Sequence, residues 1–501
     1  MKFSSLESIF AWICLLFGYL FCRVFPVHSS PFGGLCFILL LFSITTLLLV
    51  FKKCKFSATP VLVGISAVAV SLCLFLISNV FLHFLSYTYA IASYCYYVYA
   101  VCGNEMENGF SNFILVDYLK SIVITPFFAF GSLFPAIFSG KFKKGAKTFA
   151  KLTLGIALAL IPTVVVFLLL SYDNAFMDLI NRLCDWSFGD VLSHTASLMF
   201  GFPIGLYLFG LFVSSTEQRS KGFITKELCE NAAKKLRFVP AISIFTAVVP
   251  ILFLYVVFFI SQWDYYISGF TGVLPKDFSY AEYAREGFFQ LCVIALINFA
   301  IILFIITFMR RNEANKSVIL KILSVIISVF TLVLISTALS KLFLYIKYYG
   351  LTHRRIYAAW LMVVLAVIFL LILLNQIFTK LKMVPLCACV AVIAFGFLAL
   401  SNVDARIAEY NVKQYKEGSL SSVDLSELYD LEYAAIPSLI DLSNHLNSNA
   451  KLSTEDKEIK ERVEAYLKHE YENISSEKKS IFSKTLPYMK AQRALNSYFP
   501  K

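Results

Sequence analysis

Long apolar segments follow one another from Ile9 to Ser401, and the residues after them form a more polar tail. A helix of roughly 20 apolar residues is long enough to cross the hydrocarbon core of a bilayer. By that standard the pattern predicts eleven spans, or ten if the fourth, which is unusually rich in tyrosine, is not a span. The predicted spans are residues 9–26, 32–51, 60–82, 84–101, 152–171, 191–214, 239–261, 287–309, 318–340, 359–377 and 383–401. The sequence thus predicts an all-α, polytopic transmembrane helix bundle with a small, helical, soluble C-terminal tail.

Composition supports this class of fold and excludes an ordinary soluble domain. Hydrophobic residues make up 59% of the chain and charged residues 15%, with a mean hydropathy of +0.74, and a soluble fold could not bury that much apolar surface. The chain carries a net charge of +12, but residues 402–501, with 14 basic and 16 acidic residues, carry −2. The membrane part therefore carries +14, a charge that we expect to set orientation rather than to bind nucleic acid.

Basic clusters predict which loops face the cytoplasm. Successive clusters are separated by an even number of spans, so all of them can lie on one side. They are Lys52 to Lys55, Lys141 to Lys147, Arg219 to Arg237, Arg310 to Lys316, and Lys380 with Lys382. This pattern predicts a multi-pass protein of a bacterial cytoplasmic membrane with its N-terminus in the cytoplasm and its tail outside. Lys341, Lys347, Arg354 and Arg355 then lie outside, next to the membrane.

The same pattern divides the chain into four parts. Residues 1–101 hold the N-terminal spans and residues 152–401 the main transmembrane core. Residues 102–151 are apolar but interrupted by charges and prolines before a basic cluster, which indicates helices lying in the inner membrane interface. Residues 402–501 are the tail, whose leucines at 425, 428 and 431 give it a modest apolar face. The tail either folds as a small helical domain or packs against the membrane part.

Two charged segments next to the membrane carry the strongest site signal. Ser279 and Glu282 have capping-box spacing, so the helix that includes Glu286 begins outside the bilayer. Gly350 predicts a left-handed helix stop and Thr352 a cap for the following helix, whose first turn then holds two arginines that the macrodipole disfavours. We expect the two segments to pair across an outer-face charged groove; alternatively, the arginines bind lipid phosphates and the glutamates are solvated. The candidate groove residues are Tyr280, Glu282, Tyr283, Arg285, Glu286, Tyr345, Arg354, Arg355 and Tyr357.

Polar residues inside the spans are a second candidate feature. Gln290 and Asn298 lie eight residues apart on the eighth span and form a polar stripe on one helix face. The stripe is either a solute path or an internal hydrogen-bonded seam. Gly201 and Gly205 form a GxxxG motif in the sixth span, which is typical of close helix packing.

Sequence signatures of enzymes, cofactors and metals are absent where they would be expected. The chain has no phosphate-binding loop, no HExxH, no GxSxG and no GxGxxG motif. We therefore expect no cofactor, metal or catalytic residue; the alternative that stays open is a membrane-embedded transferase that uses dispersed acids such as Glu282 with Glu286. Two classes of function remain: an envelope interaction, scaffold or sensor protein that contacts a protein partner through its tail, or a transporter or lipid-handling protein that uses the outer groove. Membrane lipids are expected partners in both cases.

Three segments resemble the hallmarks of a known family. They are FSYAEYAREGFFQL, LYIKYYGLTHRRIYAAWLMVVLAVIF, and the tail entry DARIAEYNVKQY followed by VDLSELYDLEYAAIPSLIDL. In this order they resemble a bacterial membrane family, domain of unknown function 4173, over roughly Lys141 to Leu442. The resemblance implies an integral membrane protein with a similar span pattern, and it implies no activity.

Overall fold

The computed structural model describes residues 3–25, 30–138, 188–261, 288–310, 314–378, 381–448, 453–476 and 479–500, with a few single residues between 162 and 176. All the named elements in these ranges are helices, apart from one isolated bridge between Val239 and Met309. In these described ranges, ten helical segments are long and apolar enough to cross a membrane. The predicted all-α, polytopic class is therefore confirmed.

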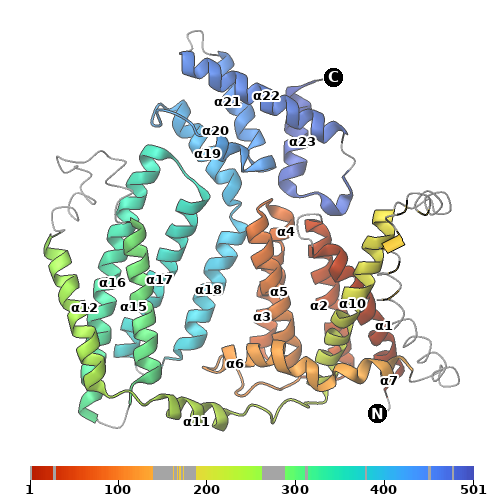
Figure 1. Ribbon diagram of the computed structural model, residues 1–501, viewed down its shortest axis with the longest axis vertical. Coiled ribbons are helices and arrows are strands. Elements are labelled where there is room, and N and C mark those ends of the chain that lie inside the picture. The colour runs from red at the N-terminus through yellow and green to blue at the C-terminus, as the bar shows by residue number, and fades with distance from the viewer. Residues whose placement is uncertain are drawn as a thin grey trace.

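The spanning helices form two neighbouring groups (Figure 1). The first group consists of α1 (Ser5–Val24), α2 (Pro31–Phe51), α3 (Ala58–Ser71), α4 (Cys73–Leu76), α5 (Val80–Val101) and α10 (Phe188–Thr216). The second group consists of α12 (Ala241–Ser261), α15 (Phe288–Phe308), α16 (Ala314–Tyr349), α17 (His353–Ile377) and α18 (Met383–Leu400). Each group has its own apolar core, and α18 contacts α3 where the two groups meet.

Close packing in the first group depends on glycines. Gly201 and Gly205 of α10 lie directly against Gly18 and Cys14 of α1, and a Cβ atom added at Gly18 would lie 2.0 Å from the carbonyl oxygen of Gly201. No larger side chain fits at that crossing. Within the described chain, the GxxxG motif thus serves an intramolecular contact.

The fourth predicted span is a continuous helix, α5, which runs beside α3 (Figure 1). It is missing from the ten apolar segments because its tyrosines lower its hydropathy. Tyr94 is fully buried, and its hydroxyl lies 2.8 Å from that of Thr45 on α2. Tyr97 makes the equivalent contact with Thr46, so these hydroxyls are packed between helices. The third span ends earlier than predicted, since Asn79 caps α5 and leaves Ile77 to Asn79 non-helical.

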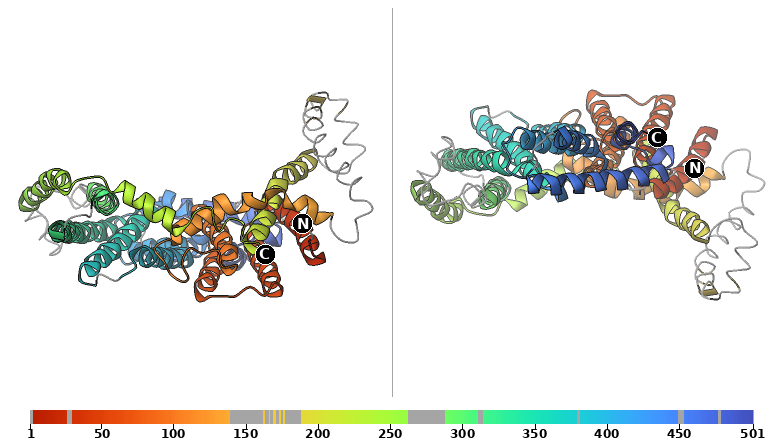
Figure 2. Two further views of the ribbon diagram at one scale, coloured as in Figure 1. Left: turned by 90° about the horizontal axis from the view of Figure 1, so that it is seen from below. Right: turned by 90° about the horizontal axis from the view of Figure 1, so that it is seen from above.

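One end of the spanning helices is covered by helices that lie across them, as Figure 2 shows from below. These are α6 (Ile114–Leu119), the π-helix η1 (Lys120–Ile124), the 3-10 helix η2 (Thr125–Ser132), α7 (Leu133–Ile137) and α11 (Lys226–Leu236). Residues 114–137 are apolar and long enough to span, yet they lie across the base in Figure 1. Lys120 is buried there, where its ammonium donates to the carbonyls of Lys221 and Ile224.

The tail lies at the opposite end, above both groups of spans (Figure 1). Its helices are α19 (Val403–Lys416), α20 (Leu425–Tyr429), the 3-10 turn η3 (Glu432–Ala434), α21 (Ile436–Ser448), α22 (Thr454–Ser476), the 3-10 turn η4 (Ile481–Ser483) and α23 (Leu486–Tyr498). Leu425, Leu428 and Leu431 of the predicted apolar face are buried, and so is Ile436. Pro437 does not break a helix, because it lies in the first turn of α21, where proline is tolerated.

The tail core continues into the membrane part. One apolar cluster joins tail residues to Ile77 and Leu82 in the first group of spans and to Leu398 at the end of α18. Ser78 also contacts Thr485 through their hydroxyls, 3.2 Å apart. The sequence left open whether the tail folds as a small helical domain or packs against the membrane part. In the structure the tail helices form an apolar core, and this core packs against the ends of the spans.

Candidate functional site: a docking junction and an adjoining groove

The turn between α16 and α17 carries the site. Helix α16 ends at Tyr349, Gly350 has a φ of +76°, and Thr352 is the N-cap residue of α17. Gly350 takes this left-handed conformation without the steric cost that a Cβ atom would add. The turn lies on the tail side of the molecule (Figure 1), at the far end of the spans from α11.

Asn411 of α19 clamps this turn. The backbone N–H of Leu351 donates to Asn411 Oδ1 at 2.6 Å, and Asn411 Nδ2 donates to the carbonyl of Leu351 at 2.8 Å. A residue between two helices has no helical partner for its backbone groups, so the side-chain amide replaces that partner. We call α16, the turn and α17 the membrane hairpin. The tail thus binds this hairpin through the main chain of Leu351.

His353 and Asp404 form the second tie. His353 Nε2 lies 2.8 Å from Asp404 Oδ1, and Asn79 Nδ2 donates to the same oxygen at 3.2 Å. The backbone N–H of His353 donates to Glu427 Oε1 at 3.2 Å. Asp404 is 4% exposed, so these hydrogen bonds replace the water that its carboxyl group would otherwise contact. We name the set Asn79, Leu351, His353, Asp404, Asn411 and Glu427 the docking junction; it joins the first group, the second group and the tail.

A cavity of about 730 Å³ opens beside the junction, between α15, the hairpin and α20. We name it the hairpin groove. Its lining residues are Phe288, Phe289, Gln290, Leu342, Tyr345, Thr352, His353, Arg354, Arg355, Glu427 and Asp430. Cations from the membrane hairpin and carboxylates from the tail thus share one cavity.

Three of the predicted groove residues line this cavity, namely Tyr345, Arg354 and Arg355. Arg355 donates to the carbonyls of Tyr349, at 2.8 Å, and Gly350, and its guanidinium lies 4.1 Å from the ring centre of Tyr345. Arg354 is exposed at the groove. The two arginines therefore differ, since Arg355 holds the turn, whereas Arg354 is exposed and forms no ion pair with a carboxylate in the described part of the chain.

The other predicted groove residues lie elsewhere. Tyr357 is not among the lining residues; its ring packs against Phe81 and His353, at centroid distances of 5.8 Å. Five of them, Tyr280, Glu282, Tyr283, Arg285 and Glu286, lie outside the described residues. The expected pairing of these glutamates with the arginines stays a prediction.

The structure separates the two residues of the predicted polar stripe. Asn298 is fully buried, where it accepts a hydrogen bond from the Tyr255 hydroxyl at 2.6 Å and donates to Thr331 at 2.9 Å. It thus joins α15 to α12 and α16. Gln290 is exposed and lines the hairpin groove. At Asn298 the geometry is that of an internal seam.

Asn298→Leu should therefore destabilise the bundle, because it removes two interhelical hydrogen bonds, each worth roughly 0.6 kcal/mol on average in membrane proteins. We expect a loss of about 1 kcal/mol, measured by thermal unfolding in detergent. Gln290→Leu, at an exposed site, should change stability by less than about 0.5 kcal/mol. Equal effects of the two substitutions would contradict the seam.

Asp424 supports the tail side of the groove, since it is the N-cap of the short helix that carries Glu427. Its carboxylate accepts hydrogen bonds from the Ser426 hydroxyl at 2.6 Å and from the backbone N–H groups of Ser426 and Glu427. The Ser426 hydroxyl, these N–H groups and the charge of Arg355 hold the pKa of Asp424 below its ordinary value.

This shift predicts acid sensitivity of α20. A carboxyl group whose pKa is lower in the folded state stabilises that state above its unfolded pKa of about 3.9 and loses this effect as the pH falls through the lower folded value. Hydrogen exchange at Ser426 and Glu427, corrected for its intrinsic pH dependence, should show weaker protection at pH 3 than at pH 7. In Asp424→Asn, which keeps a capping oxygen without the charge, the difference should shrink. Unchanged protection at pH 3 would contradict this role.

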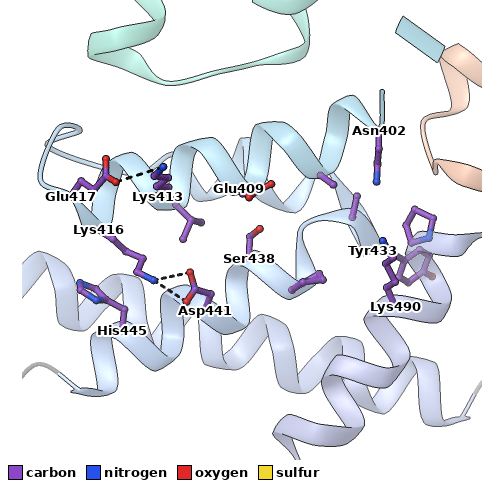
Figure 3. Close-up of a pocket in the computed structure, with 15 residues that line it drawn as sticks. Asn402, Glu409, Lys413, Lys416, Glu417, Tyr433, Ser438, Asp441, His445 and Lys490 are labelled. Carbon is purple, nitrogen blue, oxygen red and sulfur yellow. Dashed lines mark hydrogen bonds and ion pairs between the residues drawn. The ribbon is translucent and has the colours of Figure 1, made fainter. Parts of the chain in front are cut away.

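A second cavity, of about 700 Å³, lies within the tail between α19, α21 and α23 (Figure 3). We name it the domain groove. Figure 3 shows the Lys416 side chain reaching across from α19 to Asp441 on α21, with both carboxylate oxygens at 2.8 Å. Ser438 points into the space below Glu409. Val412 and Pro437 form an apolar floor. The groove is therefore lined by both charged and apolar side chains.

No cluster of three or more His, Cys, Asp or Glu side chains able to hold a metal occurs among the described residues.

The junction residues His353, Asp404, Asn411 and Glu427 were not predicted as site residues. They belong to the segments that carry the family resemblance, THRR, DARIAEYN and DLSELYD. The signal that could have pointed to them is the position of His353 directly after the cap residue Thr352, together with an aspartate in the first turn after the last span. Their contact, however, joins residues far apart in sequence, which periodicity alone does not reveal.

Comparison with known proteins identifies a family and nothing more specific. No curated protein and no solved structure matches the chain. A family model described as a domain of unknown function, DUF4153, matches residues 64–442. The resemblance to family 4173 was therefore wrong in its number, and the matched region begins earlier than expected, in α3, while it ends at Leu442 as expected. Because the match covers most of the chain and includes the whole docking junction, this integral membrane protein belongs to the DUF4153 family.

Proposed function

We propose that this protein is an envelope interaction or sensor protein, in which the tail is a partner-binding domain held in a fixed position on the membrane bundle. The observation that carries the proposal is the docking junction: two side chains of the tail, Asn411 and Asp404, bind the backbone and His353 of one membrane hairpin. Such a rigid attachment suits a domain that must respond to the state of the bundle.

The proposed location is a bacterial cytoplasmic membrane, with the N-terminus in the cytoplasm and the tail outside. The basic residues of α11 lie at one end of the spans and the tail at the other (Figure 1). The positive-inside rule then assigns the α11 end to the cytoplasm. Arg354 and Arg355 lie at the tail end, where the carboxylates of α20 face them.

The domain groove is the proposed partner site, and its expected occupant is a protein segment with an apolar strip flanked by charges of both signs. This occupant matches the apolar floor at Val412 and Pro437 and the acidic and basic residues along the rim. Burial of apolar surface in such a groove contributes affinity, and the charged residues fix the position of the bound segment along the groove.

The test is quantitative co-purification after cross-linking in native membranes. Ser438→Tyr fills the domain groove without changing its charge, and Glu461→Tyr is its control, on an exposed position of α22 that contributes nothing to the groove. We expect one stoichiometric partner to be lost from Ser438→Tyr and kept by Glu461→Tyr. Equal recovery from both variants would contradict the proposal. Removal of residues 413–501 is a poorer test, since it would expose the apolar ends of α4, α5 and α18.

A transporter or lipid-handling role is the second candidate, and the hairpin groove is the observation that favours it.

A further inference from the structure

We infer that the hairpin groove binds the head group of a phospholipid that carries both a phosphate and a primary amine. The inference deepens the proposed sensor function, on which it rests for its biological meaning, by naming the ligand class of the membrane part. The inference rests on two observations: the groove is lined by both cations and carboxylates, and it lies at the end of the spans.

The phosphate side of the site is Arg354. Its side chain is exposed at the groove, and the described carboxylates form no ion pair with it. A guanidinium in the first turn of a helix is disfavoured by the macrodipole, and a bound anion removes that penalty. Arginine also binds phosphate through paired N–H donors. Gln290 and Tyr345 add neutral donors to the same wall.

The amine side is formed by α20 of the tail. Glu427 and Asp430 line the groove opposite the hairpin cations. Glu427 already accepts from the backbone N–H of His353, so Asp430, which is exposed, is the freer carboxylate. A primary ammonium can donate to such carboxylates, whereas a quaternary ammonium has no N–H to donate. The acidic wall would repel a purely anionic head group.

The apolar part of the ligand has a place as well. Phe288 and Phe289 of α15 and Leu342 of α16 line the groove; Phe288 and Leu342 are buried, so Phe289 is the one of the three that exposes apolar surface. Phe289 is 56% exposed, and the neighbouring Phe343 is 64% exposed, as expected for side chains that face lipid tails. The groove therefore offers charged partners for a head group next to an apolar surface for acyl chains.

The experiment is native mass spectrometry of the full-length protein, delipidated in detergent and titrated with short-chain phosphatidylethanolamine, phosphatidylcholine or phosphatidylglycerol, and with glycerophosphoethanolamine as the chain-free head group. We expect phosphatidylethanolamine to bind at least about tenfold more tightly than the other two lipids, which corresponds to the loss of one charge-assisted hydrogen bond. Weak binding of the chain-free head group would place the source of the ligand in the membrane. Equal binding of the head group alone would assign the site to a soluble phosphoamine and overturn the lipid inference.

Variants separate the two halves of the site. Arg354→Gln should weaken every phosphate-bearing ligand about tenfold or more, and Asp430→Asn should bring phosphatidylethanolamine down to the affinity of phosphatidylcholine. Lys347→Gln is the matched control, an exposed cation at the same end of α16 that does not line the groove. Equal affinities of Arg354→Gln and Lys347→Gln would overturn the inference. That result would leave the partner test untouched, because partner recovery is measured at the domain groove.

Discussion

Replacing Asp404 by alanine should release the tail from the membrane hairpin. Asp404 is nearly fully buried, and its Oδ1 is shared by His353 and Asn79. Truncation removes the buried carboxylate that the imidazole and the amide share, at a cost of about 2–4 kcal/mol. Since the junction joins the tail to both groups of spans, that loss is expected to fall on docking rather than on the spans.

Limited proteolysis in detergent provides the measurement. The Asp404→Ala protein should be cut between α18 and α19 or in the tail at protease concentrations that leave the parent protein intact. Asp441→Ala is the matched control, because it removes an aspartate whose ion pair with Lys416 is largely exposed and should cost less than about 1 kcal/mol. Equal resistance of Asp404→Ala and Asp441→Ala would show that the junction does not hold the tail.

Gly350→Ala should disrupt the same attachment from the membrane side. At a φ of +76° a Cβ atom costs about 1–2 kcal/mol, and here it would also lie 2.5 Å from Asn411 Oδ1. Displacing that amide breaks the two hydrogen bonds to Leu351, worth roughly 1 kcal/mol each. The total expected loss is about 3–4 kcal/mol.

Gly418 offers a matched control, since it has a φ of +72° but open space around the added Cβ. Gly418→Ala should show the backbone cost alone, about 1–2 kcal/mol. The difference between the two variants, measured as the change in free energy of unfolding of the tail, isolates the Asn411 clamp. Equal losses at the two glycines would mean that the clamp adds nothing.

Local sequence signals predicted the elements well, and in places they predicted the turns. Gly350 and Thr352 were correctly identified as helix stop and helix start because both act within a few residues of themselves. Among the described residues, apolar runs located the spans because the bilayer imposes a length that the sequence must match, while the predicted span 152–171 lies almost wholly outside those residues. α5 was the doubtful span because its tyrosines make the segment polar. In the structure two of these tyrosines are hydrogen-bonded to Thr45 and Thr46 between helices.

The site was predictable only in part, for a physical reason. Arg354 and Arg355 drew attention because cations in a first turn need a partner, but charge alone does not say which carboxylate supplies it. Among the described residues the facing acids are Glu427 and Asp430 of the tail. Their proximity follows from how the tail packs over the spans, through Ile77, Leu398 and Leu428, and such long-range packing is not encoded in any local pattern.

Hydrogen exchange at two backbone amides tests the docked arrangement most directly. The N–H group of Leu351 lies in the turn between α16 and α17 and that of His353 at the start of α17, and their acceptors are side chains of the tail, Asn411 and Glu427. If the tail is docked as described, both amides should be protected in the intact protein and lose that protection in Asn411→Ala and Glu427→Ala, respectively. Exchange at both sites in the parent protein as fast as in an unstructured loop would contradict the docking junction.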